Sequence, residues 1–223
     1  MTIGLTVVFD GNNGAGKSGC LSEVAKHLQA QGYEVITSAE PGGTRIGKSI
    51  RTLVRGVENT EMSDIAGMML FAAARAQNVH EIIKPALKRG CLVLLDRFTA
   101  SSIAFQSAGQ GIPLDVVANI DAIARNGLEP DYTLIFDLDP RTGLARTGQR
   151  AVCDDKFELA GNEFLDRVRH DYLRQAAADQ DRFEVIDASQ SIAEVLASAI
   201  AAVDGFLERQ GFKPKIIDKD SSL

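Results

Sequence analysis

Residues 11–18 read Gly-Asn-Asn-Gly-Ala-Gly-Lys-Ser and constrain the fold more than any other stretch of the chain. Gly, four residues and then Gly-Lys-Ser is the spacing of a phosphate-binding loop. Glycines without a Cβ let successive backbone N–H groups face one anion, and the helix that follows offers its free N–H groups and dipole. We therefore predict a nucleoside triphosphate site made by Gly11, Asn12, Asn13, Gly14, Ala15, Gly16, Lys17 and Ser18, with the Lys17 charge toward the β- and γ-phosphates and the Ser18 hydroxyl toward Mg²⁺.

The surroundings of this loop support the prediction. An apolar run, Leu5–Phe9, precedes it, and apolar residues follow at helical spacing from Leu21 to Leu28. Strand, loop and helix thus come in the required order. A ligand-free turn would not explain Lys17 and Ser18. The motif alone does not separate kinases from GTPases or motor ATPases.

Composition limits the remaining possibilities. With 223 residues, 45% of them hydrophobic, the chain can bury one sizeable core, so we expect a single domain over 1–212 and a frayed C-terminal tail over 213–223. A net charge of −6 argues against a nucleic-acid partner and favours a small anion in a local basic pocket. No stretch approaches the ~20 apolar residues of a membrane span. Three widely spaced cysteines suggest neither disulfides nor zinc and fit a cytoplasmic location.

Apolar runs and turn residues predict alternating strands and helices. Four further strands are expected at 33–37, 91–95, 132–136 and 183–186. Helices are expected to span 63–88, 113 to about 126 and 191–209. Two others are expected to begin at about 46 and at 140, and one more to end at about 178. This order predicts an α/β fold of the P-loop NTPase type, a five-stranded parallel sheet with helices on both faces. Ligands should gather at the carboxyl ends of the strands.

The residues after the third predicted strand bear on the chemistry. Motor ATPases usually place a Glu after the acidic residue there, but Asp96 is followed by Arg97, which cannot act as a base. The guanine-recognition string Asn-Lys-x-Asp of GTPases does not occur in the sequence. Both observations favour phosphoryl transfer to an organic acceptor, in which catalysis is mostly positioning and charge neutralisation.

Five stretches together resemble the bacterial thymidylate kinase family along nearly the whole chain. They are Phe9-Asp10-Gly11 with the loop, Glu40-Pro41-Gly42-Gly43-Thr44 with Arg51, Leu70–Arg75, Asp96-Arg97 with Ser101–Gln106, and Pro130–Thr133. The resemblance implies a kinase that uses ATP and Mg²⁺ to phosphorylate dTMP to dTDP. It also implies a homodimer, for which the apolar helices at 65–74 and 116–123 could supply a face.

Phe71 and Arg75 stand four residues apart on a predicted helix and so share one face. A ring and a guanidinium there would stack on a base and donate to O4 of thymine, where cytosine has an amino group. The alternative is that Phe71 is ordinary core in an apolar helix.

The resemblance assigns further roles. Arg97 and Arg51 would hold the acceptor phosphate, with Arg97 acting together with Lys17 on the transferring group, and Asp96 would hold Mg²⁺ through water together with Ser18. An ion pair between Arg97 and Asp96 is the structural alternative. The remaining substrate-binding residues are expected to be Asp10, Glu40, Ser101, Ser102, Phe105 and Gln106.

Arg146 and Arg150 precede a polar segment and resemble the lid of nucleotide kinases, here at about 146–157. One of them would reach the transferring phosphate, unless the segment is simply a solvated helix end.

Four positions depart from the family pattern: Asn13, Ala39, Phe105 and Lys156 stand where an acidic residue, Arg, Tyr and Arg are usual. They leave two alternatives open, a kinase for another deoxynucleoside monophosphate and a nucleotide-binding paralogue with weak catalysis.

Overall fold

The computed structural model describes residues 4–148 and 156–214. Its centre is a five-stranded sheet in the order β2-β3-β1-β4-β5, in which every neighbouring pair is parallel. The strands are β1 (Leu5–Gly11), β2 (Val35–Ala39), β3 (Leu92–Asp96), β4 (Tyr132–Asp137) and β5 (Phe183–Asp187). The predicted five-stranded parallel sheet is therefore confirmed.

Helical segments connect these strands. Those before β3 are α1 (Lys17–Ala30), α2 (Arg45–Arg55), α3 (Asp64–Asn78), the π-helix η1 (Val79–Ile83) and α4 (Lys84–Lys88). Those after it are α5 (Thr99–Ser102), the π-helix η2 (Ile103–Gly109), α6 (Leu114–Arg125), α7 (Pro140–Thr147), α8 (Asn162–Ala178) and α9 (Ile192–Arg209).

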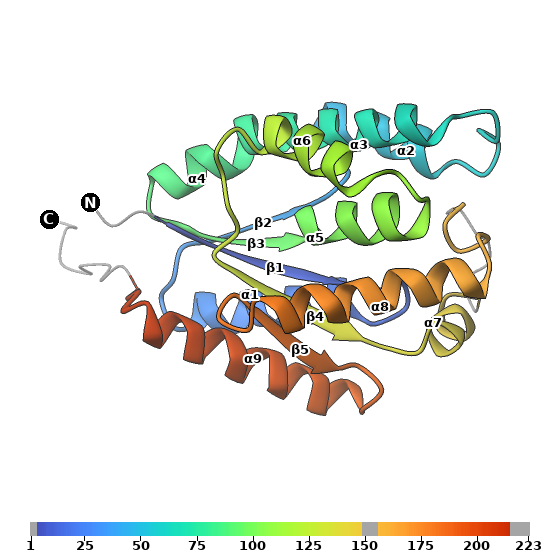
Figure 1. Ribbon diagram of the computed structural model, residues 1–223. Coiled ribbons are helices and arrows are strands. Elements are labelled where there is room, and N and C mark those ends of the chain that lie inside the picture. Colours follow the sequence, from blue (N-terminus) through green and yellow to red (C-terminus); the bar gives the residue numbers. More distant parts are fainter. Residues whose placement is uncertain (1–3, 149–155, 215–223) are drawn as a thin grey trace, which may run out of the picture.

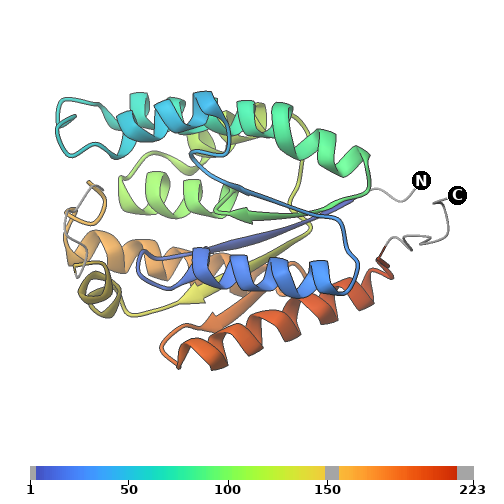
Figure 2. The same ribbon diagram turned by 180° about the vertical axis from the view of Figure 1, so that it is seen from behind.

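The helices cover both faces of the sheet (Figures 1 and 2). Alternate residues of each strand point to opposite sides, so Val7 and Phe9 of β1 pack toward α1 and α9, while Val8 packs toward η1 and α4. On that second side, α8 lies against η2 and covers Ile135 of β4. Helices α2, α3 and α6 form a further group beyond the β2 and β3 half of the sheet (Figure 1).

The predicted helical region 63–88 is a continuous run of three segments, with the π-helical turn η1 in its middle. The helical segment 99–109, made of α5 and η2, was not predicted from the sequence. Its start has no local side-chain cap. Instead, the buried Asp10 of β1 accepts from the N–H groups of Phe98 and Ser101 at 3.3 and 3.1 Å, a capping contact that spans about 90 residues of sequence.

Within residues 4–148 and 156–214, no helix is long and apolar enough to cross a membrane. The bounds 1–212 for one domain and 213–223 for a tail stay predictions. Arg150 and most of the predicted lid lie outside the described residues.

Candidate active site

A cavity of about 440 Å³ opens at the carboxyl ends of the strands, where β1, β2 and β3 deliver the phosphate-binding loop, Glu40 and Asp96. Its walls contain sixteen of the predicted site residues: Asn13, Gly14, Gly16, Lys17, Ser18, Glu40, Arg51, Phe71, Arg75, Asp96, Arg97, Ser101, Ser102, Phe105, Gln106 and Arg146. Four others, Asp10, Gly11, Asn12 and Ala15, lie in the same strand and loop but do not line it.

The phosphate-binding loop lies directly on helix α7. A Cβ on Gly14, whose φ is +77°, would stand 2.3 Å from the carbonyl oxygen of Gly143. Only glycine therefore fits this position. Lys17 is buried and donates to the carbonyl oxygen of Asn12 at 2.6 Å, so its charge is held over the loop.

Ser18 and Asp96 meet at the start of α1, where the Ser18 hydroxyl donates to a carboxylate oxygen of Asp96. A hydroxyl and a carboxylate are oxygen donors of the kind Mg²⁺ prefers, and Mg²⁺ bound to nucleotides takes only one or two protein groups. Among the described residues no cluster of three or more His, Cys, Asp or Glu could form an all-protein metal site. The pair therefore fits a Mg²⁺ ion that receives its other ligands from water and phosphate.

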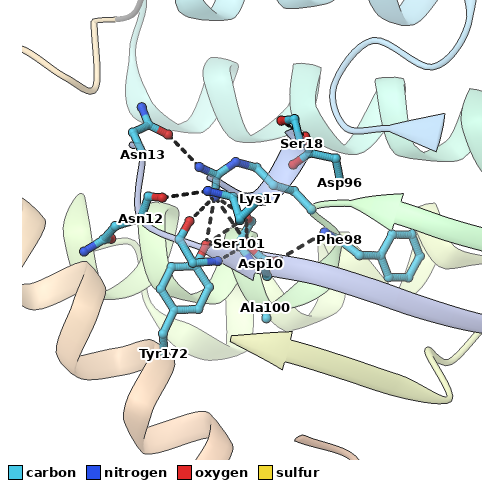
Figure 3. Close-up of polar contacts among 12 residues, drawn as sticks. Asp10, Asn12, Asn13, Lys17, Ser18, Asp96, Phe98, Ala100, Ser101 and Tyr172 are labelled. Carbon is cyan, nitrogen blue, oxygen red and sulfur yellow. Dashed lines mark hydrogen bonds and ion pairs between the residues drawn. The ribbon is translucent and has the colours of Figure 1, made fainter. Parts of the chain in front are cut away.

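Arg97 does not pair with Asp96. Its backbone has a φ of +72°, and its Nη1 donates to the carbonyl oxygen of Gly11 at 2.9 Å and to Asp10 at 3.3 Å. Its Nη2 donates to Oδ1 of Asn13 at 2.6 Å, and the Asn13 amide donates in turn to Glu158 at 3.2 Å. Two of these partners, Asp10 and Asn13, are labelled in Figure 3. Arg97 thus joins the end of β3 to the phosphate-binding loop at the cavity wall.

Arg75 is fixed on several sides. Its Nε donates to Oε2 of Glu40 at 2.7 Å, and its terminal nitrogens donate to Ser102 and to the carbonyl oxygen of Phe98, both at 2.9 Å, and to Asp121 of α6. Burial alone would lower the pKa of Arg75, but the carboxylates of Glu40 and Asp121 raise it. Arg75 therefore stays cationic while it faces the cavity.

Three aromatic rings form the apolar part of the cavity wall. Phe157 lies between Phe71 and Phe105, with ring centroids 6.0 and 5.6 Å away. Phe71 is only partly buried, and all three rings line the cavity. Gln106 and Ser102 are buried beside them. A flat nucleotide base could stack on these rings and form hydrogen bonds with these polar groups.

Two further predicted cations, Arg51 and Arg146, also line the cavity. Arg51 donates to the carbonyl oxygen of Pro41 at 2.9 Å, and Arg146 donates to that of Ala188, just after β5, at 3.1 Å. Arg146 thus joins α7 to the segment that follows β5.

Seven lining residues lie outside the predicted site set: Gly19, Ala39, Pro41, Arg55, Thr147, Phe157 and Glu158. Arg55 follows Arg51 by one helical turn, a spacing that signals a shared face. Phe157 ends the predicted lid and Glu158 follows it. Nothing local in the sequence shows that Glu158 contacts Asn13 of the loop or that Phe157 packs between Phe71 and Phe105.

Comparison with known proteins gives the same result as the geometry. A sequence model described as thymidylate kinase matches residues 9–199 of this chain. The chain belongs to the thymidylate kinase family. A thymidylate kinase of Lactobacillus delbrueckii subsp. bulgaricus is 43% identical over 202 residues, which cover 90% of this chain and 95% of that protein. Thymidylate kinases of Desulfovibrio desulfuricans and Pseudomonas fluorescens are 38% and 40% identical, each over 92% of this chain and over 97% and 98% of their own lengths. In this chain the phosphate-binding loop and the three aromatic rings line the same cavity.

Proposed function

We propose that this chain transfers the γ-phosphoryl group of ATP to dTMP, giving ADP and dTDP. Membership of the thymidylate kinase family supports this activity. The main structural support is a single cavity that is lined by the phosphate-binding loop, by aromatic rings and by the buried Arg75. Such a cavity brings two nucleotides together without a strong base. Phosphoryl transfer needs positioning and charge neutralisation rather than covalent chemistry.

On the acceptor side, Phe71 stacks on thymine and Arg75 donates to its O4. Ser102 and Gln106 order the region around the base, with Glu40 behind them as the partner of Arg75. Arg51 and Arg97 bind the acceptor phosphate. The amide of Asn13 keeps a hydrogen-bonding group toward the sugar where the family usually has a carboxylate.

On the donor side, the loop from Gly11 to Ser18 holds the phosphates of ATP. Lys17 and Arg97 neutralise charge on the transferring group, and Arg146 or Arg150 adds to this from the lid. Mg²⁺ on Ser18 and Asp96 supplies further charge neutralisation on the phosphate oxygens when it is bound.

We also propose that the chain forms a homodimer in the cytoplasm. Helices α3 and α6 pack together and carry exposed apolar side chains, among them Met69 and Ile123. A face of this kind favours association with a second copy. Cys20 and Cys91 are both buried, and the three widely spaced cysteines of the sequence favour a reducing compartment.

The test is ADP release from ATP and Mg²⁺ with dTMP, compared with dUMP, dCMP and dGMP and with a blank without acceptor. We expect release that needs dTMP and is lost in Lys17→Ala. Turnover of another monophosphate in preference to dTMP would assign a different acceptor and point to Asn13 and Ala39. Nucleotide binding without ADP release for any acceptor would support the alternative of a binding paralogue.

A further inference from the structure

Tyr172 of helix α8 places its hydroxyl beside the guanidinium of Arg97, from a part of the chain that neither the motifs nor the cavity wall includes. Nη1 of Arg97 lies 3.1 Å from this hydroxyl and 3.1 Å from Oγ of Ser101. The Tyr172 hydroxyl also donates to Oδ1 of Asp10 at 2.7 Å and lies 2.9 Å from Ser101. Figure 3 shows Tyr172, Ser101 and Asp10 grouped around one point below the loop.

The Tyr172 and Asp10 side chains of this group are closed to solvent. Tyr172 and Asp10 are almost fully buried, and burial, followed by the charge of Asp10, raises the pKa of Tyr172 well above its usual value. The phenol therefore keeps its proton and donates to Asp10 while it accepts from Arg97. A hydrogen bond in which one partner is charged is stronger than a neutral one.

The guanidinium of Arg97 also contacts an aromatic ring. The Cζ atom of Arg97 lies 5.2 Å from the centroid of Phe105, and the Phe105 and Tyr172 rings meet edge to face at 6.3 Å. With its backbone at a φ of +72°, Arg97 is thus held by hydrogen bonds and by the aromatic contact with Phe105. A planar fork recognises phosphate only when its orientation is fixed, because its donors must meet two oxygens together.

We propose that Tyr172 is a positioning residue for the acceptor phosphate, acting through the orientation of Arg97. Tyr172 does not touch the ligand, because the cavity wall contains Arg97 and Ser101 but, among the described residues, not Tyr172. The inference rests on the acceptor-phosphate role proposed for Arg97 above. It assigns part of the specificity for a phosphorylated acceptor to helix α8.

The chain offers a matched control in Tyr132. Its ring is also buried, and its hydroxyl also donates to a carboxylate, Oε2 of Glu184 at 2.9 Å. Tyr132 packs on the α9 side of the sheet, where its ring stacks on Phe206. Tyr172→Phe and Tyr132→Phe therefore remove the same group from the same kind of setting, and only the first change reaches Arg97.

The experiment measures binding of dTMP and of thymidine, which lacks the phosphate, to the full chain by calorimetry. Tyr172→Phe is expected to raise the Kd of dTMP about tenfold while the Kd of thymidine stays within about twofold. Tyr132→Phe should leave both values within about twofold. In an Arg97→Ala background, adding Tyr172→Phe should have no further effect on dTMP.

The outcomes distinguish a failure of the role proposed for Tyr172 from a failure of the role proposed for Arg97. If Arg97→Ala weakens dTMP binding but Tyr172→Phe behaves like Tyr132→Phe, the positioning role of Tyr172 is wrong. An equal loss of thymidine and dTMP binding in Tyr172→Phe would also overturn it, since a general loss of packing acts on both ligands. If Arg97→Ala leaves dTMP binding unchanged, the role of Arg97 itself fails. Should Tyr172→Phe melt too low for titration, the same comparison of dTMP with thymidine is made at a lower temperature, where Tyr172→Phe must still discriminate between the two ligands and Tyr132→Phe must not.

Discussion

The side chains of Arg75 and Glu40 form an ion pair, Nε to Oε2 at 2.7 Å, with only 4% and 5% of their surfaces exposed. The pair joins α3 to the loop after β2, and Asn78 adds a donor to the other oxygen of Glu40 at 3.0 Å. Two buried charges of this kind stabilise a fold only together, because each alone would leave an uncompensated charge out of water.

Removing one charge of this pair should therefore be costly. Glu40→Gln keeps the shape of the side chain but leaves Arg75 with Asp121 as its one carboxylate partner among the described residues. We expect the free energy of unfolding, measured with urea, to fall by about 3 kcal/mol.

Glu23→Gln is the control for this prediction. Glu23 pairs with Lys26 on the surface of α1, where the side chains are 52% and 66% exposed. Its substitution should change the free energy of unfolding by less than about 1 kcal/mol. If both substitutions lowered the free energy of unfolding equally, the buried pair would contribute no more to stability than the exposed pair.

The contact between Ser18 and Asp96 leads to a prediction about Mg²⁺. Asp96→Asn removes the negative charge next to the Ser18 hydroxyl, so the Mg²⁺ concentration for half-maximal ADP release should rise about tenfold. Ser22→Ala, an exposed change on the same helix, should leave that concentration unaltered. An unchanged Mg²⁺ dependence in Asp96→Asn would remove Asp96 from the metal site.

Local patterns in the sequence were sufficient for the strands and for the phosphate-binding loop, because both are built from neighbouring residues. The partners of the arginines were not predictable in this way. Arg97 pairs with Asp10, 87 positions away, and Arg75 with Asp121, 46 positions away on a different helix. Such contacts depend on how helices pack around the sheet, which hydrophobic periodicity does not specify. For the same reason, the contact between Tyr172 and Arg97 was not predictable from the sequence.

Tyrosine ionisation provides a prediction for alkaline pH. Burial, with a contribution from Glu184, raises the pKa of Tyr132 to about 12, whereas an unfolded chain titrates near 10. A group whose pKa is higher in the folded state adds stability that is complete below pH 10 and is lost as the pH rises toward 12.

The stability difference between the unchanged chain and Tyr132→Phe should therefore move in favour of Tyr132→Phe by about 1.4 kcal/mol between pH 8 and pH 11. Urea unfolding at the two pH values measures this change. A difference that is the same at both would mean that Tyr132 titrates alike in the folded and unfolded chain.

The exposed apolar face of α3 and α6 leads to a prediction about assembly. Ile123 of α6 is 81% exposed, and Met69 of α3 and Leu114 of α6 are 56% and 49% exposed. If a second copy covers this face, a charge at Ile123 would have to lose its water on association, so Ile123→Lys should shift the chain from dimer to monomer in sedimentation equilibrium.

Ile192→Lys is the control, because Ile192 is 90% exposed but begins α9, which covers the other side of the sheet (Figure 1). It should leave the dimer intact. A chain that sediments as a monomer before any substitution would refute the dimer. A dimer that Ile192→Lys breaks and Ile123→Lys does not would place the interface away from α3 and α6.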